Sequence, residues 1–341
     1  MKKRGIGIFL SVLCASVLLG GCGVLPFKEK AFYSKDGQKA SDAKTTAAEP
    51  PAESTPEPTA VPAEATAVPE EQKADESTAD MQKVLDEAHL MSVQYDYDGA
   101  IRYLKEQPEY ETTQAYKDAV TQYENIKATC VEYPLEEVTH VFFHTLIVDT
   151  SKAFDGDSDE AGYNQMMTTV SEFNKIMQSM YDKGYVLVSP HDMAVVNEDG
   201  TMSRGKIMLP PGKKAFVLSQ DDVSYYHYMD GDGFASKMVL DENGDVKCEY
   251  IQDDGTVLVG DYDMVPLLDG FVKANPAFSY HGRKGILAMT GYNGVFGYRT
   301  DSAYKTGKNL QDNQKEFLEN NPDFNFDEEV KNAKKIAEVL K

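Results

Sequence analysis

Residues 210–226, PPGKKAFVLSQDDVSYY, decide the fold that we predict for this chain. A Pro-Pro-Gly turn and two lysines precede the short apolar run at residues 215–218, which is the pattern of a buried strand. Asp221 and Asp222 follow that run directly, and buried carboxylates must be hydrogen-bonded, ion-paired or bound to a metal. Because catalytic groups gather at strand ends in α/β folds, this strand end is the first candidate site.

The segments before this strand alternate between strand and helix patterns. Residues 138–148 are rich in β-branched and aromatic side chains and predict a strand. Residues 163–183 carry apolar side chains at helical spacing, and Gly184 is a natural end for that helix. Residues 185–188 then form another short apolar run. This order predicts an α/β fold, either an open sheet or a barrel.

The same order resembles the NodB-type polysaccharide deacetylases (carbohydrate esterase family 4). In that family a first strand ends near a His, here His144, and a helix ends in Gly-Tyr, here Gly184 and Tyr185. A Pro-Pro-Gly-Lys turn and a strand ending in Thr-Phe-Asp-Asp-Gly follow. Here that last motif reads Ser-Gln-Asp-Asp-Val, so only the Asp pair matches. The resemblance covers residues 138–229 and implies a (β/α) barrel.

The resemblance also implies a reaction, a substrate and a metal. A divalent metal, often zinc, polarises an N-acetyl carbonyl on cell-wall or surface polysaccharide such as peptidoglycan and activates water. By position Asp221 would be the general base and Asp222 a metal ligand, while His144 could line the pocket. The alternative is that the Asp pair only caps a turn or helix.

One departure from the family bears on the metal. The family's site also needs a His-x-x-x-His motif downstream of the Asp pair, and after Asp222 the chain has only His227 and His281. We therefore expect a truncated member with an incomplete barrel, or a degenerate one, with little deacetylase activity. His140 and His144 have the spacing, but on a strand they would lie roughly 13 Å apart, too far to share a metal.

The N-terminus predicts export. A basic start at residues 2–4 and an apolar stretch at residues 6–19 are followed by Leu-Gly-Gly-Cys, which resembles a bacterial lipobox. Residues 1–21 would then be a signal peptide, and lipid on Cys22 would anchor the protein to the outer face of the bacterial cell membrane. The alternative is an ordinary signal peptide with an incidental Cys.

The remaining chain divides by composition. Residues 22–80 are rich in Pro, Ala, Thr and Glu, which predicts a disordered tether. Residues 81–130 predict a helical hairpin with a weak tetratricopeptide character, either a docking module or a unit packed on the main domain. The deacetylase-like domain would occupy residues 134–341, with an insertion of β-hairpins at about residues 230–274, where Asn-Gly and Asp-Gly turns recur.

Charge limits the partners. The formal net charge of −22 excludes nucleic acid and charge-driven docking on anionic lipid. A non-catalytic lipoprotein that binds glycan or protein is the second hypothesis, and a solute-binding lipoprotein is the third.

Residues 155–159, DGDSD, begin like a calcium loop but lack its Gly and its bidentate Glu, so we interpret them as solvated turns. Cys130 and Cys248 could pair or remain free.

Overall fold

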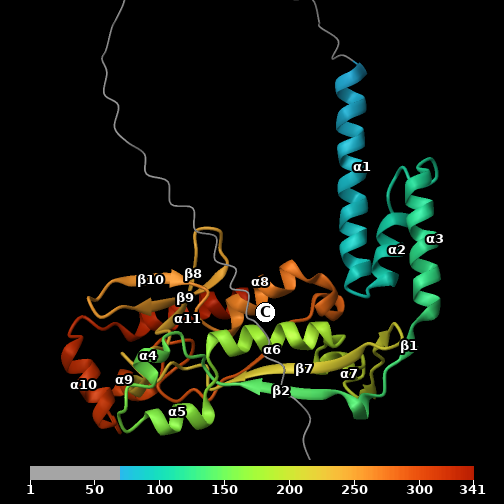
Figure 1. Ribbon diagram of the computed structural model, residues 1–341. Helices are drawn as coiled ribbons and strands as arrows, with labels where there is room; N and C mark the ends of the chain where they lie inside the picture. The colour runs from blue at the N-terminus through green and yellow to red at the C-terminus, as the bar shows by residue number, and fades with distance from the viewer. Residues whose placement is uncertain (1–69) are drawn as a thin grey trace, which may run out of the picture. The chain divides into compact units, whose positions relative to one another are not determined.

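The structure, a computed structural model, describes residues 70–341, with side chains from residue 78 onward. The expected mixed α/β class is confirmed, and the strands of these residues form several small sheets without closing into a barrel. Figure 1 shows the arrangement of the helices and strands. The predicted signal peptide, Cys22 and most of the predicted tether lie outside the described residues.

A four-stranded parallel sheet positions the candidate site. Its central strand is β7 (Lys214–Asp221), with β2 (Thr139–Phe143) on one side. The strands β3 (Tyr185–Leu187) and β11 (Ile286–Ala288) share the other side end to end. Phe216 of β7 pairs with both β2 and β3, which therefore lie on opposite sides of it. The buried strand predicted from the apolar run is thus the centre of the sheet.

Two helices cover one face of this sheet. Phe216 and Leu218 of β7 are fully buried against α6 (Val170–Asp182) and α8 (Met264–Ala274), which lie over the sheet in Figure 1. The opposite face is more polar near the carboxyl ends of the strands, where Phe142 is exposed. The two faces therefore differ, one forming a core and the other remaining open at that end.

The helix predicted over residues 163–183 is interrupted. Instead, α5 (Glu160–Met166) ends before Thr169, and α6 begins after it. The Thr169 hydroxyl accepts from the Glu172 amide and the Glu172 carboxylate accepts from the Thr169 amide, a capping box that starts a new helix. Helical spacing continues across the break, which is why periodicity alone did not reveal it.

The segment predicted as an insertion contains an antiparallel meander. It consists of β8 (Lys237–Leu240), β9 (Val246–Ile251) and β10 (Val257–Gly260), paired in sequence order. Gly244 and Gly255 have φ of +83° and +81° in the two connecting turns, a conformation that favours glycine. The hairpins predicted from the Asn-Gly and Asp-Gly dipeptides are confirmed.

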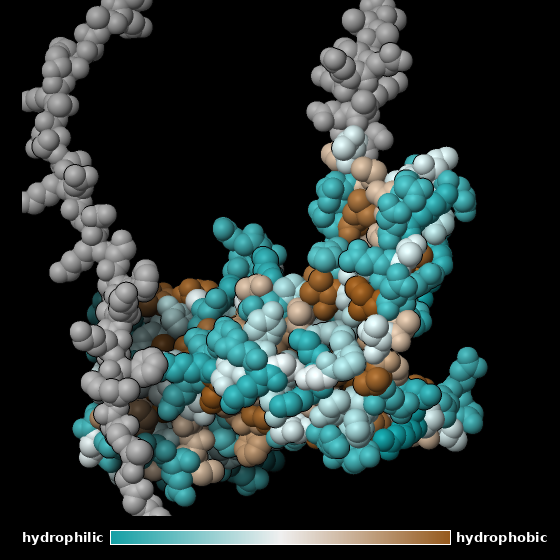
Figure 2. Space-filling model, turned by 45° about the vertical axis from the view of Figure 1, so that its right-hand side comes forward, coloured by the Kyte–Doolittle hydropathy of each residue, from teal (hydrophilic) through white to brown (hydrophobic). Residues whose placement is uncertain are grey.

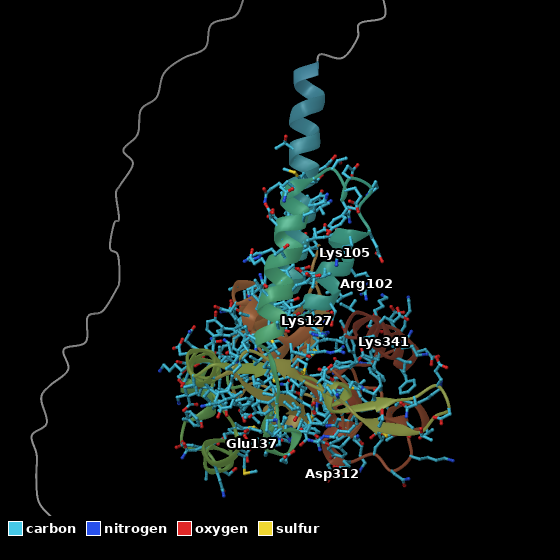
Figure 3. The ribbon with its side chains drawn as sticks, turned by 90° about the vertical axis from the view of Figure 1, so that its right-hand side faces the viewer. Arg102, Lys105, Lys127, Glu137, Asp312 and Lys341 are labelled. Carbon is cyan, nitrogen blue, oxygen red and sulfur yellow. The ribbon has the colours of Figure 1, made fainter. Side chains whose placement is uncertain are left out.

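Three helices, rather than a hairpin, precede the sheet. They are α1 (Glu70–Val93), α2 (Tyr97–Lys105) and α3 (Gln114–Thr129), and α1 begins within the segment assigned to the tether. Lys105 pairs with Glu124 at 3.0 Å across α2 and α3, and Figure 3 shows this lysine on α2. Exposed ion pairs of this kind add little stability, so packing holds the helices together.

The three helices share a core with the main domain. The Tyr95 hydroxyl donates to the Ala277 carbonyl at 2.7 Å, and the His281 amide donates to the Gln94 carbonyl at 2.7 Å. The Tyr95 and Tyr280 rings stack at 6.2 Å. These contacts agree with the expectation of a unit packed on the domain.

The other elements are short or lie near the C-terminal end. The strand pairs are β1 (Val131–Glu132) with β6 (Met208–Leu209) and β4 (Ala194–Val196) with β5 (Met202–Arg204). The further helices are α4 (Thr150–Ala153), α7 (Pro190–Met193), α9 (Ser302–Thr306), α10 (Asp312–Asn320) and α11 (Phe326–Val339). Short 3₁₀ turns lie at Leu135–Glu137, His227–Met229, Pro276–Phe278 and Tyr280–Gly282.

The surface fits the acidic composition. Figure 2 shows a face that is mostly hydrophilic, with hydrophobic side chains in small patches. Within residues 70–341, no helix combines the length and apolar character needed to cross a membrane. Cys130 and Cys248 are both free thiols, so the possible disulfide between them is not formed.

One buried carboxylate joins the central elements. Asp263, immediately before α8, is fully buried. It accepts from the Leu146 amide at 3.1 Å, the Gln220 amide group at 2.8 Å, the Tyr225 hydroxyl at 2.6 Å and the Met264 amide at 2.8 Å. Burial raises the pKa of the Asp263 carboxyl, while these donors oppose that rise. Asp263 thus fixes the ends of β2 and β7 to the start of α8.

Replacing Asp263 should destabilise the fold strongly. Asp263→Ala leaves several buried donors unpaired, each worth about 1–3 kcal/mol, so we expect the free energy of unfolding in urea to fall by about 3 kcal/mol or more. Glu198→Ala, at an exposed turn position, is the control and should change it by about 0.5 kcal/mol or less. Equal losses in the two variants would contradict this role of Asp263.

The same carboxyl gives a pH dependence. Because its pKa is raised in the folded state, its protonation favours folding at low pH, and this contribution is lost as the pH rises through the folded-state pKa. Asp263→Asn cannot titrate. We therefore expect the difference in unfolding free energy, wild type minus Asp263→Asn, to fall as the pH rises above about 4. A difference that grows with pH would show the opposite shift.

Candidate functional site

The carboxyl ends of three parallel strands bring the predicted residues together. In the register of the sheet, Phe143 lies beside Gln220 and Ala288 lies beside Asp221. The residues that follow these strands therefore emerge at one edge, where ligand sites of α/β sheets lie. We call this edge, with His144, Asp221 and Asp222, the strand-end site.

Asp222 leaves the sheet in an unusual backbone conformation. Its φ is +58°, in the left-handed region that costs energy for a residue with a Cβ. Its amide donates to the Ala288 carbonyl at 3.0 Å, and its carbonyl accepts from the Ser224 amide at 2.5 Å. The two neighbouring carboxylates approach different partners, Asp222 approaching His144 and Asp221 approaching Ser219.

His144 lies beside Asp222. The His144 Nδ1 and the Asp222 Oδ2 atoms are 3.7 Å apart, and both side chains are partly exposed. A neutral imidazole and a carboxylate at this separation can bind one ligand atom or one cation between them.

Asp221 belongs to a different small network. Its Oδ1 lies 3.5 Å from the Ser219 hydroxyl, which is 2.9 Å from the His140 Nε2 atom. His140, which the sequence predicted to lie too far from His144 to share a metal with it, therefore contacts the same network as the predicted base. It is displaced along β2 from His144, with Phe142 between the two rings.

The strand-end site does not hold a complete set of zinc ligands. Catalytic zinc takes three protein ligands and one water, and His144 with Asp222 supplies two. Among residues 78–341, no third His, Cys, Asp or Glu joins this pair to form a metal-ligand group. The residues present do not fit the metal centre that the deacetylase resemblance implies, which agrees with the missing His-x-x-x-His motif.

Tyrosines extend the strand-end site. The Tyr226 and Tyr228 rings stack at 5.4 Å with an interplanar angle of 16°, and Tyr292 lies 5.6 Å from Tyr226. Tyr228 is 48% exposed and Tyr292 39% exposed, so both rings face solvent. Burial, with the nearby charges of Tyr226, Asp222 and Asp159, raises the pKa of Tyr228 to about 12. We call these three rings the tyrosine cluster.

The sequence did not predict the tyrosine cluster. Tyr226 and Tyr228 were visible in the deciding stretch, but nothing in their spacing indicated an exposed stack. Tyr226 is held by a contact of 3.1 Å between its hydroxyl and that of Thr290, which follows β11. The cluster depends on the pairing of β11 with β7, which a single sequence does not specify.

A separate group of carboxylates could hold a metal ion. Oxygens of Asp157, Asp159 and Asp232 lie within 4.8 Å of one another. The turn interpretation also holds, since the Asp157 carboxylate accepts from the Asp159 amide at 2.8 Å. Asp232 comes from a distant segment and is held by the Tyr163 hydroxyl at 2.8 Å. No sequence pattern joined Asp232 to the other two.

The backbone of Asp222 gives a testable contrast with Asp221. Glycine adopts positive φ without strain, so Asp222→Gly should leave the free energy of unfolding unchanged or raise it. Asp221→Gly, at the end of β7, should lower it by about 1 kcal/mol. Thermal unfolding of both variants measures this, and equal destabilisation would contradict the strain at Asp222.

Comparisons of the chain with protein-family models, with curated proteins and with solved structures found no match.

Proposed function

We propose that this protein is an exported, lipid-anchored protein of the bacterial cell envelope that binds N-acetylated polysaccharide at the strand-end site. The observation that carries the proposal is the position of the tyrosine cluster beside Asp222 and His144. Exposed aromatic rings can stack on the apolar faces of sugar rings, and carboxylate and imidazole groups hydrogen-bond to hydroxyl and amide groups.

A deacetylase-like scaffold is the second part of the proposal. The sheet is parallel, with α6 and α8 on one face and polar side chains at the open end of the other. An incomplete NodB-like (β/α) barrel would contain a parallel sheet of this kind, with helices covering one face. The Asp pair at the carboxyl end of β7 is also where that family would place its base and metal ligand.

The location follows from the N-terminal sequence. Acyl chains on Cys22 would attach the protein to the membrane, and the segment rich in Pro and Ala would hold the domain away from it. Polysaccharide of the cell wall or cell surface is the ligand within reach of such a domain.

Hydrolysis is the second candidate function, favoured by Asp221 next to Asp222 and His144. Deacetylation adds water across the amide, breaks the C–N bond and releases acetate and an amine. In the related enzymes a metal supplies the polarisation of the carbonyl. The strand-end site offers two possible metal ligands, His144 and Asp222, where a catalytic zinc takes three. We therefore propose that the site binds polysaccharide without efficient turnover.

Binding to N-acetylated sugar should depend on the tyrosine cluster. We expect Tyr228→Ala to weaken binding of triacetylchitotriose about tenfold, as loss of a stacked ring removes about 1–1.5 kcal/mol. Isothermal titration calorimetry measures this. Tyr110→Ala, between α2 and α3, is the control and should bind like wild type. Absence of binding by the wild-type protein would refute the proposed function.

Deacetylase activity should be near background. We expect the wild-type protein and the Asp221→Asn variant to release acetate from triacetylchitotriose at the same rate when zinc is added. Removing the proposed base has no effect on this rate if the wild-type protein does not turn the substrate over. Zinc-dependent release that Asp221→Asn abolishes would instead establish the hydrolytic function.

A further inference from the structure

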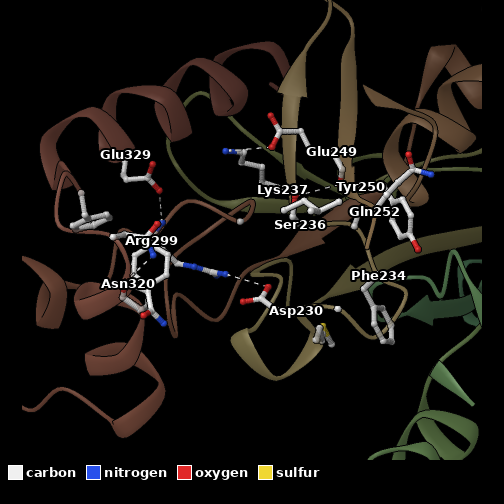
Figure 4. A pocket seen from close by; sticks show the side chains of 18 of the residues that line it. Asp230, Phe234, Ser236, Lys237, Glu249, Tyr250, Gln252, Arg299, Asn320 and Glu329 are labelled. Carbon is white, nitrogen blue, oxygen red and sulfur yellow. Dashed lines mark hydrogen bonds and ion pairs between the residues drawn. The ribbon is translucent and has the colours of Figure 1, made fainter. Parts of the chain in front are cut away.

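A cavity, which we call the second cavity to separate it from the strand-end site, lies next to the meander formed by β8, β9 and β10. Its volume is about 980 Å³, and it is lined by residues of β8 and β9, of the loop at residues 229–236, and of the segments around α10 and α11. Figure 4 shows these walls facing one another. None of His144, Asp221 and Asp222 lines it, so it is distinct from the strand-end site. Its size is within the range of cavities that bind small organic ligands.

The charges of this cavity are mostly paired within its walls. Lys237 pairs with Glu249 at 3.3 Å, and Arg299 faces Asp230 at 3.9 Å. Figure 4 shows both pairs pointing into the space between the walls. Carboxylates outnumber cationic groups in the lining, which disfavours phosphates and other anions. An uncharged ligand is not repelled by these carboxylates.

Arg299 places a buried cation in the wall of this cavity. It is 6% exposed, and its Nη1 donates to the Tyr225 carbonyl at 2.7 Å. Its guanidinium also lies 5.9 Å from the centre of the Phe317 ring. The 3.9 Å between Nη2 and the Asp230 carboxylate exceeds a hydrogen bond, so a hydroxyl could bridge donor and acceptor there.

Aromatic rings and amides complete the lining. Phe234, Tyr250 and Phe317 belong to the lining, and Phe234 and Tyr250 are only 5% and 8% exposed. Gln252 and Asn320 add exposed amides at the rim, in line with their positions in Figure 4. The exposed parts of these rings offer apolar contact rather than a full stacking face. Neighbouring donors and acceptors suit hydroxyls, which act as both.

We propose that this cavity is a second binding site, for an uncharged, hydroxyl-rich short oligosaccharide. The inference goes beyond the proposed function and does not depend on it, because the lining residues are different. If both sites bind the same polysaccharide molecule, binding at one site makes binding at the other intramolecular. The protein then binds the polysaccharide more tightly than either site does alone.

The test is a nuclear magnetic resonance titration of the full chain with triacetylchitotriose and with cellotriose. We expect shifts of the Arg299 Nε–H signal and of the Gln252 and Asn320 side-chain amides that saturate with at least one trisaccharide. The variant with Gln252→Ala and Asn320→Ala should weaken the binding reported by Arg299 about tenfold. Gln82→Ala on α1 is the control and should leave it unchanged.

Two outcomes overturn the inference. One is the absence of saturable shifts at Arg299 and the rim amides with both sugars. The other is saturation of these signals by inorganic phosphate but by neither sugar, which would indicate an anion site. A Ser236→Trp variant, whose ring would occupy part of the cavity, must reduce the Arg299 shifts while the remaining spectrum shows a folded chain. Tyr228→Ala must leave the Arg299 shifts unchanged. Loss of sugar binding at the strand-end site can therefore be distinguished from loss of sugar binding in this cavity.

Discussion

The buried carboxylate of Asp263 is the constraint on which the rest of the structure depends. Its partner Gln220 immediately precedes Asp221, and its partner Leu146 lies two residues after His144. Its third partner, Tyr225, leads into the tyrosine cluster. A fully buried charge is stable only with such partners, so the arrangement that satisfies Asp263 also fixes the ends of β2 and β7. The contacts that satisfy Asp263 are therefore also the contacts that position the strand-end site.

Local patterns predicted the elements better than the site. The strand at residues 215–218 and the β-hairpins within residues 230–274 followed from apolar runs and turn dipeptides, since these signals act over a few residues. The break at Thr169 was missed because a capping box competes with helical periodicity. His144 was singled out from the family resemblance, as the His near the end of the first strand, and the structure places it 3.7 Å from Asp222. The tyrosine cluster and Asp232 could not be predicted, because distant segments bring their groups together.

Metal-binding groups are divided between two places of different chemistry. The strand-end site offers one imidazole and one carboxylate, a mixed set that zinc accepts but that is too small for a catalytic centre. Asp157, Asp159 and Asp232 offer only oxygens, which suit harder cations such as calcium or magnesium better than zinc. The segment that carries Tyr228, Asp230 and Asp232 thus borders the strand-end site, the carboxylate group and the second cavity.

The open side of β2 has a consequence for handling the protein. Within the described residues β2 pairs with β7 alone, and Phe142 on it is 56% exposed. An unpaired edge with an exposed aromatic ring is a template for another chain to add a strand. The net charge of −22 opposes such contacts between copies. Because salt screens that repulsion, the tendency of the protein to self-associate will rise with ionic strength.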